Sequence, residues 1–444
     1  MTHFAEAREN ARNLFCQDQA LRQQLARACL IWDLEGRLRV LVEPAAGINA
    51  ASVSTHVDGL LKSVAAPFWS GEIWTWTKAS SKSEQALYEK AWTEAQRAII
   101  DPGPPEIRGL ERHVSKDAWF ASQINPPWPW LEQTEPIIAF YSFKGGVGRT
   151  TALLSVAVQL ARAGLRVAVV DLDLEAPGVL AALPPSAGAE PACGVIDYLL
   201  ERPLVARPND LDLADFYYTV DDPLVIKSGA PLVVVPAGRV DGAYLEKLAR
   251  LDYERLHALM EAGADQSPLV DLLKQLRSEL KAQYVLLDSR AGFHDLGGMA
   301  LSGMAHLDVL FGLDSEQSWA GMRQVVRFLG RDRLDRGKEQ LACALVYAMA
   351  PDPGKREDAV DQFKERAYLV FSEEYYAEEG TDNEDLWTLP DQDAQEQPHF
   401  PLVVGFNPLV QRYQSAASIA DQLAEGDFRL FAERILERVG RKLP

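Results

Sequence analysis

One segment constrains the fold of this chain more than any other: a glycine-rich loop between an apolar strand-like run and a helix-like run. The loop, FKGGVGRTT, spans residues 143–151, after the run 137–142 and before the run 152–161. Glycines let the backbone curl so that successive N–H groups point at a polyphosphate, and the following helix directs its positive N-terminus at the same anion. A plain glycine-rich turn is the alternative, but the order of strand, loop and helix favours a phosphate-binding loop.

The loop therefore predicts a nucleotide site. Its binding residues are expected to be Gly145, Gly146, Val147, Gly148, Arg149, Thr150 and Thr151. The Thr150 hydroxyl would contact Mg²⁺, and Lys144 and Arg149 bring positive charge to the phosphates.

Two more apolar runs end in carboxylates. VAVVDLD ends in Asp171 and Asp173, which would share one side of a strand and face a metal ion and the terminal phosphate. YVLLD ends in Asp288, which we expect to bind Mg²⁺ through water, because Mg²⁺ dehydrates reluctantly. A solvated acidic turn is the alternative for Asp171 and Asp173. The predicted metal site is thus Thr150, Asp171 and Asp288.

Length and spacing predict two domains. The chain has 444 residues, and proline-rich stretches at 101–105 and 125–130 suit linkers, so we place a boundary near Thr134. Residues 1–133 read as an α+β domain with a helix over 4–28 and a hairpin. Its tryptophans, Trp74 and Trp76 among them, either pack against a helix or bind a partner.

Residues 134–444 alternate apolar strands with helices. This pattern predicts an α/β fold, a mostly parallel doubly wound sheet. The expected strands are 137–143, 167–171, 232–236, 284–288, 309–313, 343–347 and 402–406. An acidic insertion is expected near 352–399, since 371–396 carry ten acidic residues and no Lys or Arg. The amphipathic segment 428–439 is expected to pack on the sheet, with membrane binding as the alternative.

Charge and composition restrict the kinds of partner that the chain can bind. The formal net charge is −19, which is poorly suited to non-specific binding of DNA or anionic lipid. No apolar run approaches the ~18–20 residues that span a bilayer. The four cysteines are scattered, and the N-terminus does not read as a signal peptide, so a cytoplasmic location is expected.

The motif KGGVGRTT resembles the deviant Walker A motif of ParA/MinD-like P-loop ATPases. The resemblance implies ATP and Mg²⁺ as ligands and an ATP-dependent homodimer. Lys144 would be the catalytic lysine that contacts phosphates, often those on the other subunit, and Asp173 would orient the attacking water. Asp288 would begin the loop that distinguishes ATP from ADP. The usual P-loop lysine is replaced by Arg149, which predicts slow hydrolysis.

The resemblance implies a Mg²⁺-dependent ATPase that acts as a dimerisation switch. We expect residues 1–133, which are rich in aromatic residues, and the acidic insertion to bind the partner protein that the switch regulates. A branch found in bacterial conflict systems is similar in KGGVGRT and VDLDLEAPG, which adds an expected role in antiviral defence. Two alternatives stay open. One is a partitioning ATPase that binds DNA, and the other is an ATP-binding scaffold that does not hydrolyse.

Overall fold

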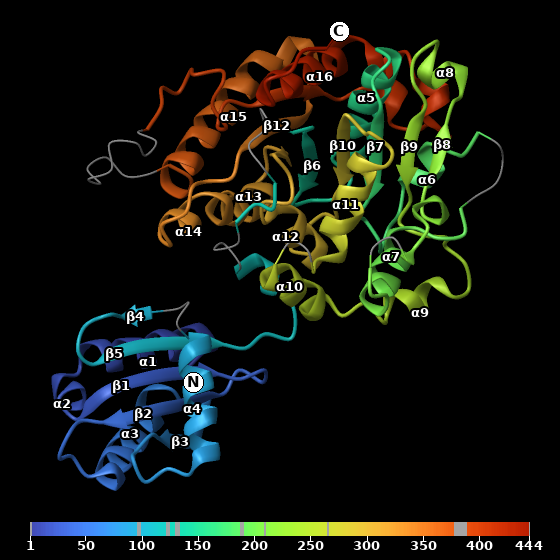
Figure 1. Cartoon of the computed structure of the whole chain (residues 1–444). Helices are drawn as coiled ribbons and strands as arrows, with labels where there is room; N and C mark the ends of the chain where they lie inside the picture. The colour runs from blue at the N-terminus through green and yellow to red at the C-terminus, as the bar shows by residue number, and fades with distance from the viewer. Residues whose placement is uncertain are drawn as a thin grey trace. The chain divides into compact units, whose positions relative to one another are not determined.

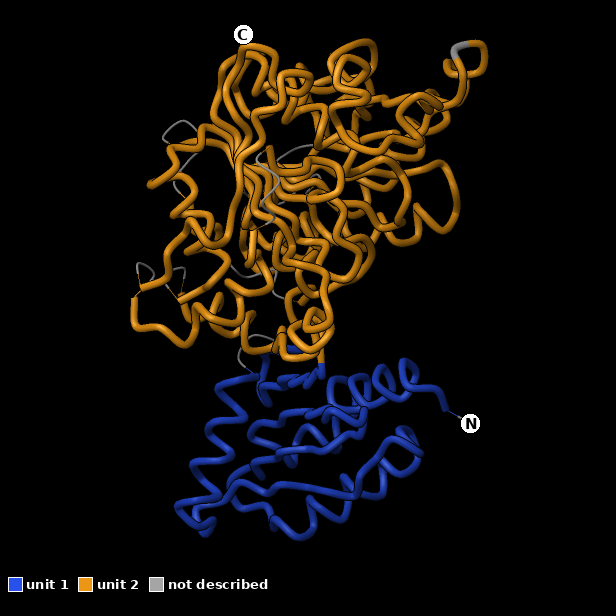
Figure 2. The backbone as a smooth tube through the Cα atoms, turned by 90° about the vertical axis from the view of Figure 1, so that its right-hand side faces the viewer, with its two compact units in different colours: residues 1–114 blue, residues 115–444 orange. Residues whose placement is uncertain are grey.

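The structure of the chain is a computed structural model that describes residues 2–95, 99–120, 125–128, 134–186, 191–207, 210–263, 266–376 and 389–443. The chain forms two compact units, residues 1–114 and 115–444 (Figure 2). This division lies earlier in the chain than the boundary expected near Thr134.

The first unit contains a five-stranded sheet of order β3-β2-β1-β5-β4 (Figure 1). Its elements are α1 (Phe4–Gln17), α2 (Gln19–Arg22), β1 (Leu25–Trp32), β2 (Leu38–Pro44), α3 (Ala50–Val64), β3 (Trp69–Thr75), α4 (Lys82–Glu94), β4 (Ile99–Asp101) and β5 (Glu106–Glu111). The expected hairpin is confirmed as the antiparallel pair β1 and β2.

The helix expected over residues 4–28 is wrong in its second half. Helix α1 ends at Gln17, and the Asp18 side chain accepts a hydrogen bond from the Leu21 N–H to begin the short helix α2. From Leu25 the chain is the strand β1, which pairs with both β2 and β5. Burial in the middle of a sheet outweighs the helical tendency of the residues before it.

The tryptophans of the first unit are largely used in packing. The Trp74 ring stacks on Tyr88 of α4 with ring centroids 6.0 Å apart, and the Arg27 guanidinium lies 4.0 Å from the Trp76 ring centroid. The Trp32 side chain is buried in the core. Packing against a helix, the first of the two alternatives, therefore accounts for Trp74.

The second unit contains an eight-stranded sheet of order β13-β12-β11-β6-β10-β7-β9-β8. Its strands are β6 (Ile137–Ser142), β7 (Val167–Asp171), β8 (Tyr218–Val220), β9 (Leu232–Val235), β10 (Tyr284–Asp288), β11 (Leu307–Gly312), β12 (Cys343–Ala350) and β13 (Leu402–Gly405). All neighbours pair in parallel except β8 and β9. The predicted fold class, a mostly parallel doubly wound sheet with a smaller N-terminal domain, is confirmed.

Helices cover both faces of this sheet (Figure 1). They are α5 (Arg149–Arg162), α6 (Val179–Ala182), α7 (Val195–Glu201), α8 (Pro223–Ile226), α9 (Tyr244–Leu248), α10 (Tyr253–Ala262), α11 (Pro268–Ser278), α12 (Asp295–Leu301), α13 (Glu316–Leu329), α14 (Arg331–Leu334), α15 (Pro353–Glu374) and α16 (Gly426–Arg438). Helices α5 and α16 share one core cluster, while α11, α12 and α13 pack against the opposite face. Phe428, Phe431 and Ile435 of α16 are buried, which confirms the expectation that this segment packs on the sheet.

The expected acidic insertion is smaller than residues 352–399. Residues 353–374 form α15, whose Phe363, Ala367 and Phe371 side chains are buried against β12 and α13. This helix is therefore part of the layer that covers the sheet. The acidic residues between 377 and 388, and Trp130, lie outside the described residues.

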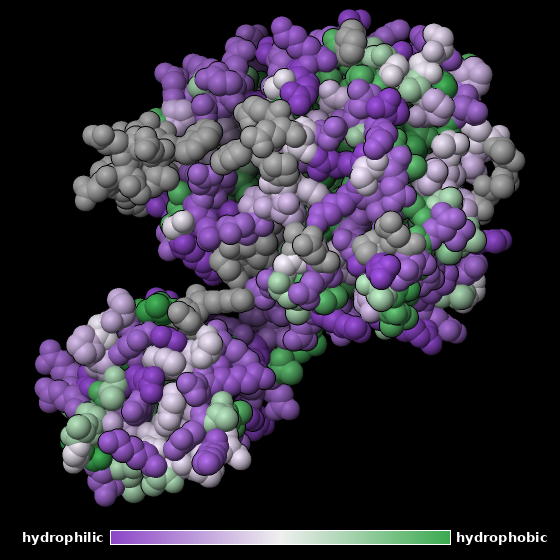
Figure 3. All heavy atoms as spheres, in the orientation of Figure 1, coloured by the Kyte–Doolittle hydropathy of each residue, from purple (hydrophilic) through white to green (hydrophobic). Residues whose placement is uncertain are grey.

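Hydrophilic side chains cover most of the face shown in Figure 3. None of the helices in the described part of the chain combines the length and apolar character needed to cross a bilayer.

Strand order brings the predicted site residues together. Strand β10 lies between β6 and β7, and Asp288 pairs with Asp171 in the register. The glycine-rich loop after β6 and the carboxylates at the ends of β7 and β10 therefore meet at one edge of the sheet, where open α/β sheets bind ligands.

Candidate functional site

The glycine-rich loop opens into a cavity of about 690 Å³. Gly146 and Gly148 have φ angles of 75° and 81°, which favour glycine. A Cβ atom built at Gly145, Gly146 or Gly148 would meet no heavy atom within 4 Å. The loop thus presents bare backbone to open space at the N-terminus of α5, the arrangement that binds phosphate groups.

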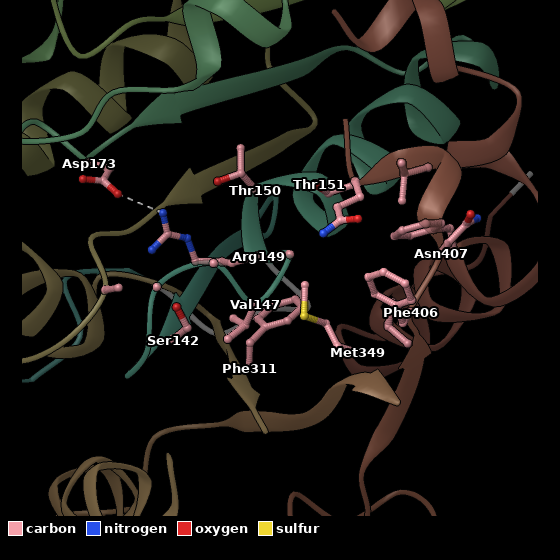
Figure 4. A pocket seen from close by; sticks show the side chains of 18 of the residues that line it. Ser142, Val147, Arg149, Thr150, Thr151, Asp173, Phe311, Met349, Phe406 and Asn407 are labelled. Atoms are coloured by element: carbon pink, nitrogen blue, oxygen red, sulfur yellow. Dashed lines mark hydrogen bonds and ion pairs between the residues drawn. The ribbon is translucent and has the colours of Figure 1, made fainter. Parts of the chain in front are cut away.

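The far wall of the cavity is apolar and comes from strands β11, β12 and β13, the loop after β13 and helix α16 (Figure 4). Its main side chains are Phe311, Met349, Val404, Phe406, Val410, Tyr413 and Phe428. Met349, two residues after the predicted strand 343–347, lines this wall. Phe406 and Asn407 were missed as site residues, although they lie at the end of the predicted strand 402–406 and just after it, where a ligand-facing loop belongs.

Arg149 lies at the centre of the carboxylate cluster. Its Nε donates to Asp288 Oδ1 at 2.7 Å and its Nη2 donates to Asp173 Oδ2 at 3.1 Å. Only 8% of Arg149 is exposed. Burial alone would lower the pKa of Arg149, but the charges of Asp288 and Asp173 outweigh burial and raise it. Figure 4 shows the guanidinium turned toward Asp173.

Asp288 and Thr150 offer a donor set that fits Mg²⁺. The Thr150 hydroxyl donates to Asp288 Oδ2 at 2.8 Å, so a hydroxyl and a carboxylate already lie together beside the phosphate loop. Hard oxygen donors beside a phosphate site are what Mg²⁺ prefers. Burial raises the pKa of Asp288, and the Arg149 charge opposes this rise.

Asp171 is placed differently from the expectation that it faces a metal ion. Its Oδ1 accepts from the Asp173 N–H at 3.0 Å, and its Oδ2 accepts from the N–H groups of Gly178 and Val179. Strand β7 ends at Asp171, so the strand alternation that would align it with Asp173 does not continue. Asp171 instead holds the loop that carries Asp173.

Asp173 lines the cavity, and two arginine side chains donate hydrogen bonds to its carboxylate. Besides the Arg149 contact, its Oδ1 accepts from Arg290 Nη1 at 2.7 Å. Lys144, in contrast, is exposed and does not line the cavity. A single chain therefore brings Asp173, Thr150 and Arg149 together but leaves Lys144 outside.

The loop after β10 is connected to the loop after β7 by a network that the sequence did not reveal. Glu175 Oε1 lies 2.5 Å from His294 Nε2 and accepts from the Tyr253 hydroxyl at 3.3 Å. His294 also caps α12, since its Nδ1 accepts from the Leu296 N–H. His294 therefore both caps α12 and joins the two loops.

Residues 116–120 of the second unit pack on the same loop. Trp119 Nε1 donates to the His294 carbonyl oxygen at 2.9 Å, and Lys116 Nζ lies 2.6 Å from Asp295 Oδ2. The Trp119 ring lies 5.2 Å from the Phe293 ring, which lies 5.1 Å from Phe143 of the phosphate loop. Continuous packing thus joins the phosphate loop to the segment that directly follows the first unit.

A family model matches the part of the chain that contains the phosphate loop and its carboxylates. Residues 138–297 match the family model of the CobQ/CobB/MinD/ParA nucleotide binding domain. A search of curated protein sequences gave no match.

Similar solved structures include the cell division ATPase MinD of Pyrococcus furiosus, with 17% identity over 69% of this chain and 99% of that one and a TM-score of 0.42. MinD of Pyrococcus horikoshii complexed with Mg-ADP is 19% identical over 68% of this chain and 95% of that chain, with a TM-score of 0.40. The pNOB8 ParA bound to nonspecific DNA is 13% identical over 69% of this chain and 99% of that chain, with a TM-score of 0.43. The matched residues 138–297 contain the phosphate loop, Asp171, Asp173 and Asp288, so this part of the chain is similar to nucleotide-binding domains.

Proposed function

We propose that the chain is a Mg²⁺-dependent ATPase whose nucleotide state controls dimerisation and, through the N-terminal unit, a partner protein. One observation carries this proposal. The bare phosphate loop, the Thr150 hydroxyl and the Asp173 carboxylate line one end of a cavity whose other end is apolar and aromatic. That combination suits a polyphosphate at one end and a planar base at the other.

Each group of site residues would have its own role in phosphoryl transfer. The backbone N–H groups of residues 145–148 would bind the phosphates, and Thr150 and Asp288 would hold the metal ion. Bound Mg²⁺ would neutralise charge on the transferring phosphoryl group. Asp173, at the cavity wall, would orient the attacking water. Exposed Lys144 suits a contact with a nucleotide bound to a second subunit.

The packing of residues 116–120 supports a link between nucleotide state and the N-terminal unit. Trp119 and Lys116 contact His294 and Asp295, which follow the loop expected to respond to the terminal phosphate. A change in that loop would therefore alter the anchorage of the chain just after the first unit. The motifs KGGVGRTT and VDLDLEAPG, similar to those of the conflict-system branch, favour a defence role for the regulated partner.

The test measures dimerisation and phosphate release together. Asp173→Asn should retain ATP binding, because its role lies in the transition state, and should lower the hydrolysis rate about 100-fold or more. With ATP the variant should sediment as a longer-lived dimer than the parent. Hydrolysis at the parental rate would remove Asp173 from the mechanism, and a monomer at saturating ATP would contradict the switch.

A non-hydrolysing scaffold is the second candidate, and one contact favours it. Both oxygens of Asp173 accept from arginines, Oδ2 from Arg149 and Oδ1 from Arg290. A carboxylate held in this way is poorly placed to take a water. ATP-dependent dimerisation without measurable phosphate release in the parent would support the scaffold.

A further inference from the structure

We propose that Arg149 takes the place of a divalent cation at Asp288 while it also pairs with Asp173, so that metal ions bind only when a polyphosphate draws the guanidinium away. The inference rests on the proposed nucleotide site, because it assigns the phosphates of that ligand a second role. Its evidence is the bridge that Arg149 forms between the ends of β10 and β7.

The bridge compensates charge that the fold has buried. Asp288 is 1% exposed and Asp173 is 8% exposed, and buried carboxylates need a cation or several hydrogen bonds. Arg149 supplies both carboxylates with a charge-assisted hydrogen bond, using Nε for one and Nη2 for the other. A lysine ammonium is a compact point charge and lacks the planar fork that serves two acceptors at once.

A metal ion that took Asp288 alone would have to expel Arg149 from this bridge. The buried guanidinium would then keep only its Asp173 partner, and taking a charged partner away from a buried charge is strongly unfavourable. Phosphate oxygens at the adjacent loop provide replacement acceptors, because guanidinium groups bind phosphate as readily as carboxylate. Metal and polyphosphate are therefore expected to enter together.

The same displacement affects Asp173. Arg149 and Arg290 both hold this carboxylate, so moving Arg149 onto phosphate releases one of its two oxygens. The arrival of nucleotide thus frees Asp288 for the metal and Asp173 for water at the same time. Arg149 is a positioning residue in this account, and it acts on two carboxylates through one side chain.

The test uses MgCl₂ alone and thermal unfolding of the full chain, with NaCl matched for ionic strength. The parent should show no rise in Tm with Mg²⁺. Arg149→Ala should unfold at a lower temperature in EDTA, and saturating Mg²⁺ should raise its Tm by about 2–4 °C. The matched control is Arg290→Ala, which also removes an arginine from Asp173 but leaves Asp288 paired, so Mg²⁺ should not shift its Tm.

Two results would overturn the inference: a Tm rise with Mg²⁺ alone in the parent equal to that in Arg149→Ala, or no rise in either protein. Should Arg149→Ala fail to fold without metal, Arg149→Lys takes its place, and its Tm should still rise with Mg²⁺. Calorimetry with ADP and ATP on the parent is separate. If the parent binds neither ADP nor ATP, the proposed function is wrong. The Tm comparison with Mg²⁺ alone does not depend on that result, because no nucleotide is present in it.

Discussion

At the scale of single residues, Thr150 connects the phosphate loop to the acid at the end of β10. Its hydroxyl donates to Asp288 at 2.8 Å, and it is the first side chain of α5 after Arg149. A hydroxyl in this position adds a neutral oxygen donor to a carboxylate, which suits Mg²⁺ without adding negative charge.

Thr150→Ala should weaken nucleotide binding mainly when Mg²⁺ is present. Removing a metal ligand should cost at least about tenfold in affinity for the magnesium–nucleotide complex, with a smaller effect on nucleotide in EDTA. Thr150→Ser, which keeps the hydroxyl, is the matched control and should bind like the parent. Calorimetry with ADP in the two buffers measures the difference, and equal losses in both would argue against a metal role.

The sequence predicted the phosphate loop because a glycine-rich segment there follows an apolar strand and precedes a helix, and all three signals agree. It did not predict the orientation of Asp171, because a carboxylate at a strand end can face a ligand or accept backbone N–H groups. The structure has Asp171 accepting three such bonds. Nor could the sequence reveal that Arg149 bridges Asp288 and Asp173, since that contact joins positions far apart in the chain.

At the scale of elements, α12 and the loop before it receive the segment 116–120. A Cβ atom at Gly298 of α12 would lie 2.9 Å from Trp119 Nε1, so the helix surface is shaped to receive this indole. Seven strands of the second sheet were predicted from apolar runs. The short edge strand β8 was not, because three residues carry too little pattern.

Trp119→Ala should loosen the loop before α12. We expect a loss of about 1–3 kcal/mol in the free energy of unfolding, together with faster hydrogen exchange over residues 289–296 in the nucleotide complex. Trp128→Ala is the matched control. It removes a similar hydrogen bond, from Nε1 to the Met304 carbonyl oxygen, which lies beyond the C-terminal end of α12. Equal exchange changes in both variants would mean that Trp119 has no special link to the loop.

At the scale of the whole molecule, the two units suggest where the chain can be divided. Residues 115–120 belong to the compact second unit, and Lys116, Ala118 and Trp119 contact α12 or its cap. Removal of residues 1–114 should therefore leave nucleotide binding intact. Removal of residues 1–133 should lower the Tm further, because it also removes Trp119 and Trp128. Equal Tm values for the two shortened proteins would contradict this division.

The net charge predicts how strongly the full chain binds DNA. With a formal net charge of −19, binding to bulk duplex DNA should be weak at physiological salt and should fall steeply as salt rises. Fluorescence anisotropy with a labelled duplex, with and without ATP, measures this. Tight ATP-dependent binding at physiological salt would favour the partitioning alternative.

The most direct test of the nucleotide site compares the two glycines that flank α5, by calorimetry with Mg²⁺ and ATP. Gly148 and Gly164 stand before and after this helix with φ angles of 81° and 80°, and a Cβ at either would meet no atom within 4 Å. Replacing either with Val should cost similar backbone strain, about 1–2 kcal/mol. We predict that Gly148→Val abolishes ATP binding and Gly164→Val retains it. ATP binding by Gly148→Val with parental affinity would contradict the account.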